Sequence, residues 1–159
     1  MIKTTALLSA DIRLWEETVS FVMTAEERMA FLAEPHIGIL AITRDGRAPL
    51  AVPVWYDYEP GGDLLIWIER DTVKDKLIRA AGTFSLAVHN ETEPYKYVTV
   101  EGPVIANDAP PTRDQAVKIA SRYFPVDRSE QYVDEALGEH SVLVRMRPQK
   151  WLSNDQSKG

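Results

Sequence analysis

Three residues of types that commonly bind phosphate stand close together near the middle of the chain, namely Arg70, Thr72 and Lys74. A run typical of a strand leads into them, and Thr72 followed by Asp75 predicts a short helix that ends at Gly82. The first turn of a helix carries backbone amides without intrahelical acceptors, and these attract an anion. With charge-assisted hydrogen bonds from Arg70 and Lys74, the segment predicts a phosphate site.

A second interpretation of the same segment is an ordinary solvated helix start. Asp71 and Asp75 are acidic residues at the positive end of the predicted helix, where they compete with a bound anion. Taken alone, the segment leaves the two interpretations equally open.

Most other chemistry is excluded or unsupported by the residue types. The 159 residues include no cysteine, which excludes disulfides, thiolate nucleophiles, iron–sulfur clusters and thiolate zinc sites. The motifs G-x-S-x-G, G-x-G-x-x-G, G-x-x-x-x-G-K-[ST] and H-E-x-x-H are absent, which argues against hydrolase and P-loop functions. His36, His89 and His140 are far apart in the sequence, so structural or surface roles are favoured over metal binding. We therefore predict neither a catalytic side chain nor a metal site.

Composition indicates one globular domain. Apolar residues make up 45% of the chain and charged residues 26%, which are ordinary values for a folded protein. The formal net charge of −6 provides no general basic surface, so we expect no nucleic-acid partner. No apolar run approaches the roughly 20 residues that span a bilayer, and charged residues interrupt the N-terminus where a signal peptide would stay apolar. We expect no membrane partner and a cytoplasmic location.

Periodicity predicts the elements that must position the phosphate-binding residues. Alternation with period two and intervening turn residues predict six strands, over residues 37–43, 48–56, 64–70, 83–90, 96–105 and 140–147. Capping and proline signals predict helices from Ala25, and over about 72–81, 112–123 and 129–137. The expected organisation is an N-terminal extension over 1–23, a single domain over 24–152 and a polar tail over 153–159.

An antiparallel barrel is the expected arrangement of these strands, because an open sheet of so few strands would expose two edges. Pro53 cannot donate a ladder hydrogen bond, so it marks an edge strand or the place where the sheet parts. Aromatic residues on the strands are expected mostly in the core or at an interface, with a minority that could stack on a ligand ring; they are Trp55, Tyr56, Trp67, Tyr95 and Tyr97.

The order of these motifs resembles that of the pyridoxamine 5'-phosphate oxidase-like family, which includes FMN enzymes and reductases that depend on the deazaflavin coenzyme F420. The resemblance spans roughly residues 25–151. It rests on the Asp-Gly hairpin at 45–46, V-P-V-W at 52–55, T-x-K at 72–74 and V-E-G at 100–102. Two departures are Leu77, where the family often has Asn, and A-G-T-F-S-L at 81–86 in place of D-P-R-V-S-L.

The resemblance implies a six-stranded antiparallel split β-barrel of the FMN-binding type, mainly β with flanking helices. It also implies a homodimer with two cofactors at the interface. The implied cofactor contacts are the backbone of Val52, Pro53, Val54 and Trp55 along the tricyclic ring, Ile68 and Glu69 at the ring's edge, Arg70, Thr72 and Lys74 at the phosphate, and Trp151 near the site.

In such proteins the cofactor supplies the hydride chemistry and the protein positions its ring, so no acid–base pair is needed. The resemblance therefore implies an oxidoreductase acting on a small organic substrate. A non-catalytic protein that stores, carries or senses the cofactor is the alternative. F420 is favoured over FMN because the barrel is minimal and because Lys76, Arg79 and Lys96 could contact the coenzyme's glutamate tail. The alternative is that these three residues are ordinary surface charges.

Overall fold

The computed structural model describes residues 20–159, so the predicted N-terminal extension over 1–23 lies almost entirely outside the described residues. Seven strands are present: β1 (Gly38–Arg44), β2 (Arg47–Val54), β3 (Leu64–Glu69), β4 (Thr83–His89), β5 (Lys96–Ala106), β6 (Ser141–Met146) and β7 (Lys150–Asp155). Four α-helices accompany them: α2 (Ala25–Ala33), α3 (Val73–Ala81), α4 (Arg113–Ser121) and α5 (Val126–Ala136). The predicted mainly β class with flanking helices is confirmed.

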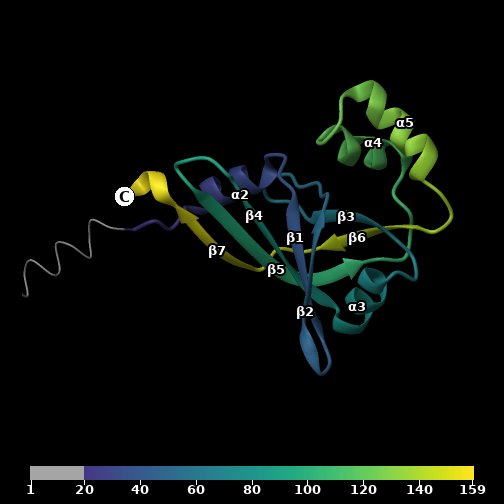
Figure 1. Cartoon of the computed structure of the whole chain (residues 1–159), viewed down its shortest axis with the longest axis horizontal. Helices are drawn as coiled ribbons and strands as arrows, with labels where there is room; N and C mark the ends of the chain where they lie inside the picture. The colour runs from purple at the N-terminus through teal and green to yellow at the C-terminus, as the bar shows by residue number, and fades with distance from the viewer. Residues whose placement is uncertain (1–19) are drawn as a thin grey trace, which may run out of the picture.

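All strand pairs are antiparallel, and the strands follow the order β2-β1-β4-β5-β6-β3, with β7 pairing with β5. The long strand β5 joins two parts of the sheet, because its first half pairs with β4 and β7 while its last residues pair with β6. The sheet curls into a half-barrel (Figure 1). Strands β2 and β3 end the order and do not pair with each other in the described part of the chain, so the barrel is split there; Asp57, in the segment after β2, forms one isolated bridge with Leu65 on β3.

The seventh strand, β7, differs from the sequence expectation of six strands and a polar tail from residue 153. Its inward positions carry Ser153 and Asp155 rather than apolar residues, so the alternation gives no hydrophobic signal. Both polar side chains are satisfied: Ser153 Oγ accepts from the Met23 amide at 3.1 Å, and Asp155 accepts from Ser157. One long-range hydrogen bond to Met23 and local bonds to Ser157 therefore replace hydrophobic burial at this edge.

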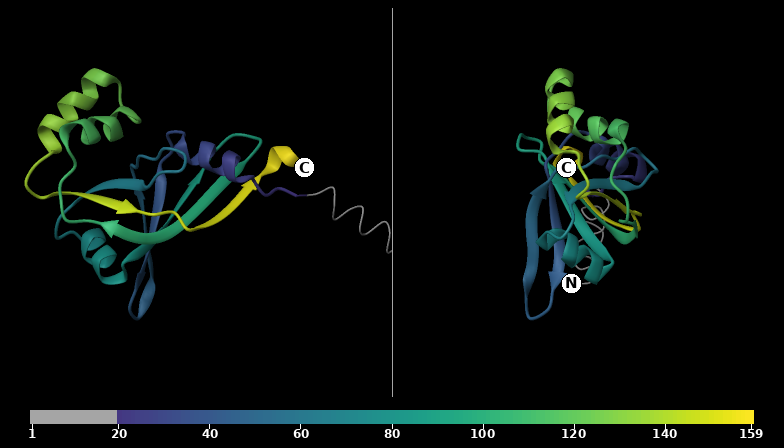
Figure 2. Two further views of the ribbon diagram at one scale, coloured as in Figure 1. Left: turned by 180° about the vertical axis from the view of Figure 1, so that it is seen from behind. Right: turned by 90° about the vertical axis from the view of Figure 1, so that its right-hand side faces the viewer.

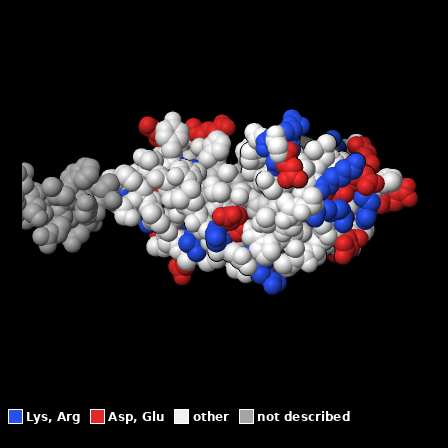
Figure 3. Space-filling view, turned by 90° about the horizontal axis from the view of Figure 1, so that it is seen from below, with Lys and Arg blue, Asp and Glu red and all other residues white. Residues whose placement is uncertain are grey.

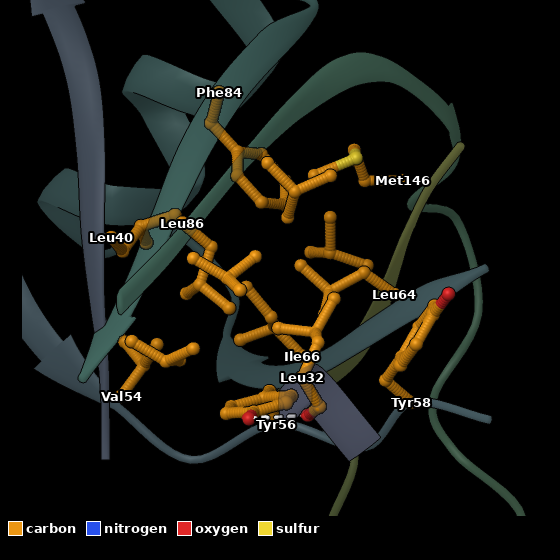
Figure 4. Packing of buried hydrophobic residues seen from close by; sticks show 14 of the residues in the cluster. Leu32, Leu40, Val54, Tyr56, Tyr58, Leu64, Ile66, Phe84, Leu86 and Met146 are labelled. Atoms are coloured by element: carbon orange, nitrogen blue, oxygen red, sulfur yellow. Dashed lines mark hydrogen bonds between the residues drawn. The ribbon is translucent and has the colours of Figure 1, made fainter. Parts of the chain in front are cut away.

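Leucine, isoleucine and valine side chains from both parts of the sheet fill the interior of the half-barrel (Figure 4). Leu64, Ile66 and Leu86 are fully buried and point toward one another there. Helix α2 covers one side through Leu32, which lies beside Tyr56. A second, smaller cluster of Ala116, Ala120 and Val133 holds α4 and α5 together away from the main core, and these helices project from the sheet in Figure 2.

The C-terminal end of α2 lacks basic residues, and side chains from elsewhere in the chain bind its last carbonyl groups. The Tyr56 hydroxyl donates to Leu32 O at 2.6 Å, and Arg122 donates to Ala33 O at 2.9 Å. His36 contributes Nε2, which lies 3.1 Å from Phe31 O. These bonds attach the helix to the segment after β2 and to the end of α4.

His36 predicts a pH-dependent part of the stability. Its side chain is 13% exposed, and burial lowers its pKa even though Glu34 lies 3.3 Å away. The unfolded chain, with an ordinary histidine pKa of about 6.5, binds a proton more readily than the folded chain, so stability falls as the pH drops through this range. The free energy of unfolding of the parent minus that of His36→Gln should therefore decrease between about pH 7.5 and about pH 5.5 in urea titrations. A difference that stays constant or grows on acidification would contradict this assignment.

Candidate functional site

A hollow of about 190 Å³ lies between the open ends of β2 and β3, the start of α3 and the pair α4–α5. Six of the residues that line it belong to the predicted cofactor contacts: Pro53, Val54, Trp55, Ile68, Glu69 and Lys74. The other lining residues are Trp67, Ile119, Tyr132 and Ala136. The structure thus brings segments from four parts of the chain to one place.

The floor of the hollow comes from two strands that are each paired along one edge, β2 with β1 and β3 with β6. Within residues 20–159, β2 has no partner on its other edge, which agrees with the predicted edge position of Pro53. On β3, alternation turns Ile66 and Ile68 to the core, and it turns Trp67 and Glu69 to the opposite face. Backbone groups of the two strand ends can therefore lie along a flat ligand.

The start of α3 supplies the anion-binding features of the hollow. Thr72 caps the helix, since its hydroxyl accepts from the Asp75 amide at 3.3 Å and donates to Glu69 O at 2.8 Å. Within residues 20–159, the amides of Val73 and Lys74 have no acceptor, and the half-buried Lys74 side chain has no ion pair. Two backbone donors and one cation are thus left for a ligand at this end of the hollow.

Of the two acidic residues that compete for this helix start in the sequence, Asp75 is paired elsewhere, whereas Asp71 is exposed. Asp75 is 1% exposed; it accepts from the Asp71 amide at 2.9 Å and pairs with Arg79 Nε at 2.9 Å. Asp71 adopts the left-handed conformation, with φ 65°. Because the charge of Asp75 is paired beneath the helix, the geometry favours a phosphate site over a merely solvated helix start.

Several other predicted residues serve the fold rather than the hollow. Arg70 extends toward Asp108 O at 3.5 Å, and Arg79 also donates to Asn107 O at 2.7 Å. Lys96 lies 3.9 Å from Asp155 at the other end of the sheet. Of the three cations considered for a glutamate tail, only Lys76 is exposed and lacks an ion pair within the described part of the chain.

Val52 and Trp151 lie outside the hollow. Both pack against the main core. Trp151 lines a separate hollow of about 250 Å³ with Tyr58 and Arg147, and the Arg28 guanidinium lies 4.9 Å above its ring. Within one chain, Trp151 does not line the hollow that contains Lys74. It could contact a cofactor bound in that hollow only from a second copy of the chain.

An aromatic wall from α4 and α5 closes the hollow opposite α3. Trp55 and Tyr123 stack with ring centroids 4.9 Å apart and planes 10° apart. Tyr132 lies 5.3 Å from Trp55 and 5.8 Å from Trp67, between the two indoles. Such a wall favours a planar ligand, because offset or edge contacts between aromatic rings are attractive.

Buried charges fix the position of this wall. Asp57, directly after β2, is 5% exposed and lies 3.5 Å from Lys118 Nζ and 3.6 Å from Arg122 Nη1, both on or next to α4. The hydroxyl of Tyr123 donates to His36 O at 2.7 Å and accepts from the Tyr56 amide at 3.1 Å. Burial raises the pKa of Tyr123, so it remains a neutral phenol that can do both.

The sequence did not identify Ile119, Tyr132 or Ala136 as site residues, and it gave Trp67 only as one of five strand aromatic residues of which a minority could stack on a ligand. A signal existed for Trp67, because it is a large aromatic residue on the strand face that points away from Ile66 and Ile68. The residues of α4 and α5 show only an apolar helical face, and nothing in that pattern tells which strand ends the face will cover.

Comparisons with known proteins support the fold. No family model and no curated protein matches the sequence. A conserved hypothetical protein from Mycobacterium tuberculosis has a similar structure, with a TM-score of 0.71, 21% identity and coverage of 87% of this chain and 88% of that one. A FAD-binding protein from Mesorhizobium loti gives a TM-score of 0.62, with 22% identity and coverage of 84% and 96%. A structure described as an F420 reductase gives 0.56, with 22% identity and coverage of 77% and 94%.

These likenesses show the split-barrel fold found in pyridoxamine 5'-phosphate oxidase-like proteins, as the resemblance implied. Over residues 20–159, no helix is long and apolar enough to cross a membrane. In the same residues, no group of three or more metal-binding side chains comes together.

The ion pairs of Asp57 allow a test of what fixes the aromatic wall in position. Asp57→Asn removes the buried partner of Lys118 and Arg122 and should lower the free energy of unfolding by about 3 kcal/mol, measured by urea titration. Glu59→Gln is the matched control, because Glu59 also pairs with Lys118 but is exposed, and it should have little effect. Equal effects of the two substitutions would show that the buried pair does not fix α4.

Proposed function

We propose that this protein is an oxidoreductase that binds a flavin-type cofactor, a deazaflavin or FMN, in the hollow between β2, β3, α3 and α4–α5. The observation that carries the proposal is the arrangement of a half-buried Lys74, without an ion pair in the described part of the chain, and two helix amides, without an acceptor there, at one end of a hollow with planar aromatic walls. This combination suits a planar ring joined to a phosphate. The split-barrel neighbours described as an F420 reductase and a FAD-binding protein support the same class of ligand.

The residues fit the cofactor in parts. Lys74 and the amides of Val73 and Lys74 would hold the phosphate, because helix amides and a nearby cation favour an anion. The backbone of Pro53, Val54 and Trp55 would lie along the ring, with Ile68 and Glu69 at its edge. Arg70 extends toward Asp108 O and does not line the hollow, and the Thr72 hydroxyl is already used as the helix cap.

When bound, a flavin-type cofactor supplies hydride transfer to or from a substrate. The chain's own contribution is then to orient the ring, exclude water from one side through the aromatic wall and leave room for a small organic substrate.

A homodimer is part of the proposal. The hollow in one chain is smaller than the roughly 300–1,000 Å³ of typical ligand sites, so a second chain would complete it. Strand β2 offers a surface for this, because Pro49, Ala51 and Pro53 are exposed on a hairpin that projects from the rest of the chain (Figure 1). Trp151 would join a cofactor site only through such a partner.

Between the two cofactors we favour the deazaflavin, whose glutamate tail would need a cation outside the phosphate position. Figure 3 shows Lys and Arg side chains mixed with acidic ones at the end of the molecule that carries α3, within a face otherwise low in charge. Lys76 is the exposed residue that remains for the tail, since Arg79 and Lys96 are paired with acidic residues.

A protein that stores or senses the cofactor without turnover is the second candidate. The observation that favours it is the wall formed by Trp55, Tyr123 and Tyr132, which covers one side of the hollow. Reduction of the bound cofactor followed by reoxidation with candidate acceptors distinguishes the two, because a storage protein shows no acceleration over free cofactor.

Replacement of Lys74 tests the phosphate assignment. Lys74→Ala should weaken FMN binding by about 1.5–3 kcal/mol, or roughly 10- to 150-fold, in a fluorescence titration. Lys76→Ala, on the same helix, is the control and should leave FMN binding unchanged, while it should weaken binding of the tailed deazaflavin. An FMN dissociation constant that is the same for Lys74→Ala and the parent would show that Lys74 does not bind the phosphate.

The oligomeric state tests the shared site. Light scattering on the eluting protein with cofactor bound should give a mass twice the 17.9 kDa of one chain. A single-chain mass with cofactor still bound would show that one chain forms the whole site.

A further inference from the structure

The indole N–H of Trp67 is a buried hydrogen-bond donor without an acceptor. Trp67 lies on β3 between Ile66 and Ile68, and its ring lines the hollow. Its Nε1 atom is fully buried and has no hydrogen-bond partner within residues 20–159. A donor in this state loses its bonds to water without replacement, which costs about 1–3 kcal/mol.

The surroundings of the ring explain the missing partner. The indole packs against the small cluster of Ala116, Ala120 and Val133, and Tyr132 meets it edge-on at 5.8 Å. These neighbours offer hydrophobic surface, which a leucine or phenylalanine on β3 would fill without a buried N–H. Packing alone therefore does not account for tryptophan at this position.

We propose that the Trp67 N–H donates to an acceptor on the ring of the bound cofactor, a carbonyl oxygen or ring nitrogen. In the unliganded chain this N–H is covered, and α5, whose Tyr132 meets the indole edge-on, moves away from it for the contact to form while α4 stays in place. The inference rests on the proposed function. FMN and the deazaflavin share such acceptors on the pyrimidine part of their rings, so the contact does not depend on which of them binds.

The position of Trp67 along β3 assigns the contact to the ring rather than the phosphate. Lys74 stands beyond the end of the strand, on α3, whereas Trp67 stands two residues before Glu69, about 7 Å back along β3. Trp55 and Tyr132, which form the aromatic wall, are its neighbours in the hollow.

The test replaces the N–H and keeps the shape of the ring. β-(3-benzothienyl)alanine at position 67 has sulfur in place of N–H, and Trp67→Phe provides a second variant that uses only natural residues. With the N–H unpaired in the unliganded chain, the thermal midpoint of the benzothienyl variant should be unchanged or higher. Both variants should bind FMN about tenfold more weakly than the parent. With riboflavin, which lacks the phosphate, they should show the same loss, whereas Lys74→Ala should show none.

Each contrary result has a distinct meaning. Unchanged FMN affinity in both variants would overturn the inference and leave the proposed function standing. A fall of about 3 °C or more in the midpoint of the unliganded benzothienyl variant would reveal an existing partner for the N–H and overturn it too. A loss with FMN but not with riboflavin would move the contact to the phosphate arm and contradict the inference. If the parent bound neither FMN nor the deazaflavin, the proposed function would fall and the inference with it.

Discussion

The hollow depends on how the chain crosses from β2 to β3 through Tyr56 and Asp57. These strands end the sheet order and do not pair with each other; the crossing segment itself is joined to β3 by the bridge between Asp57 and Leu65, with two hydrogen bonds of 2.9 Å. The side chains at the crossing do the rest: Tyr56 binds the end of α2, and Asp57 faces Lys118 and Arg122. A buried carboxylate needs such partners, so the crossing and α4 must take up one relative position.

The position of α4 relative to the segment between β2 and β3 determines the shape of the hollow. Arg122 also binds the carbonyls of α2 and stacks 4.8 Å from the Tyr56 ring, so α4 cannot shift without breaking several bonds. Tyr123 is thereby stacked on Trp55, and α5 brings Tyr132 between Trp55 and Trp67. On the opposite side, Asp75 is paired with Arg79 rather than with Lys74. One group of buried polar contacts shapes the wall, and another preserves the anion-binding end.

The sequence predicts most of the fold where burial follows a simple period. The box of Thr24 and Glu27 starts α2, and Gly82, with φ 68°, ends α3 as expected. Strand β7 escapes prediction because its buried positions are Ser153 and Asp155, which are held by hydrogen bonds to Met23 and Ser157 rather than by hydrophobic contacts. At the site, Lys74 and the strand ends are recognisable from local patterns. The contributions of Tyr132 and Ile119 cannot be recognised in this way, because they depend on the long-range pairing of Asp57 with α4. The resemblance implies a position near the same site for Trp151, which lines another hollow within one chain.

The central claim is that a planar, phosphate-bearing cofactor occupies the hollow between β2, β3, α3 and α4–α5. A crystal structure of the chain grown with the deazaflavin or FMN tests it most directly. The claim predicts density for a tricyclic ring beside the backbone of Pro53–Trp55, with its phosphate within hydrogen-bonding distance of Lys74 Nζ and the Val73 amide. Density for the cofactor elsewhere, such as the hollow lined by Tyr58 and Trp151, would contradict it.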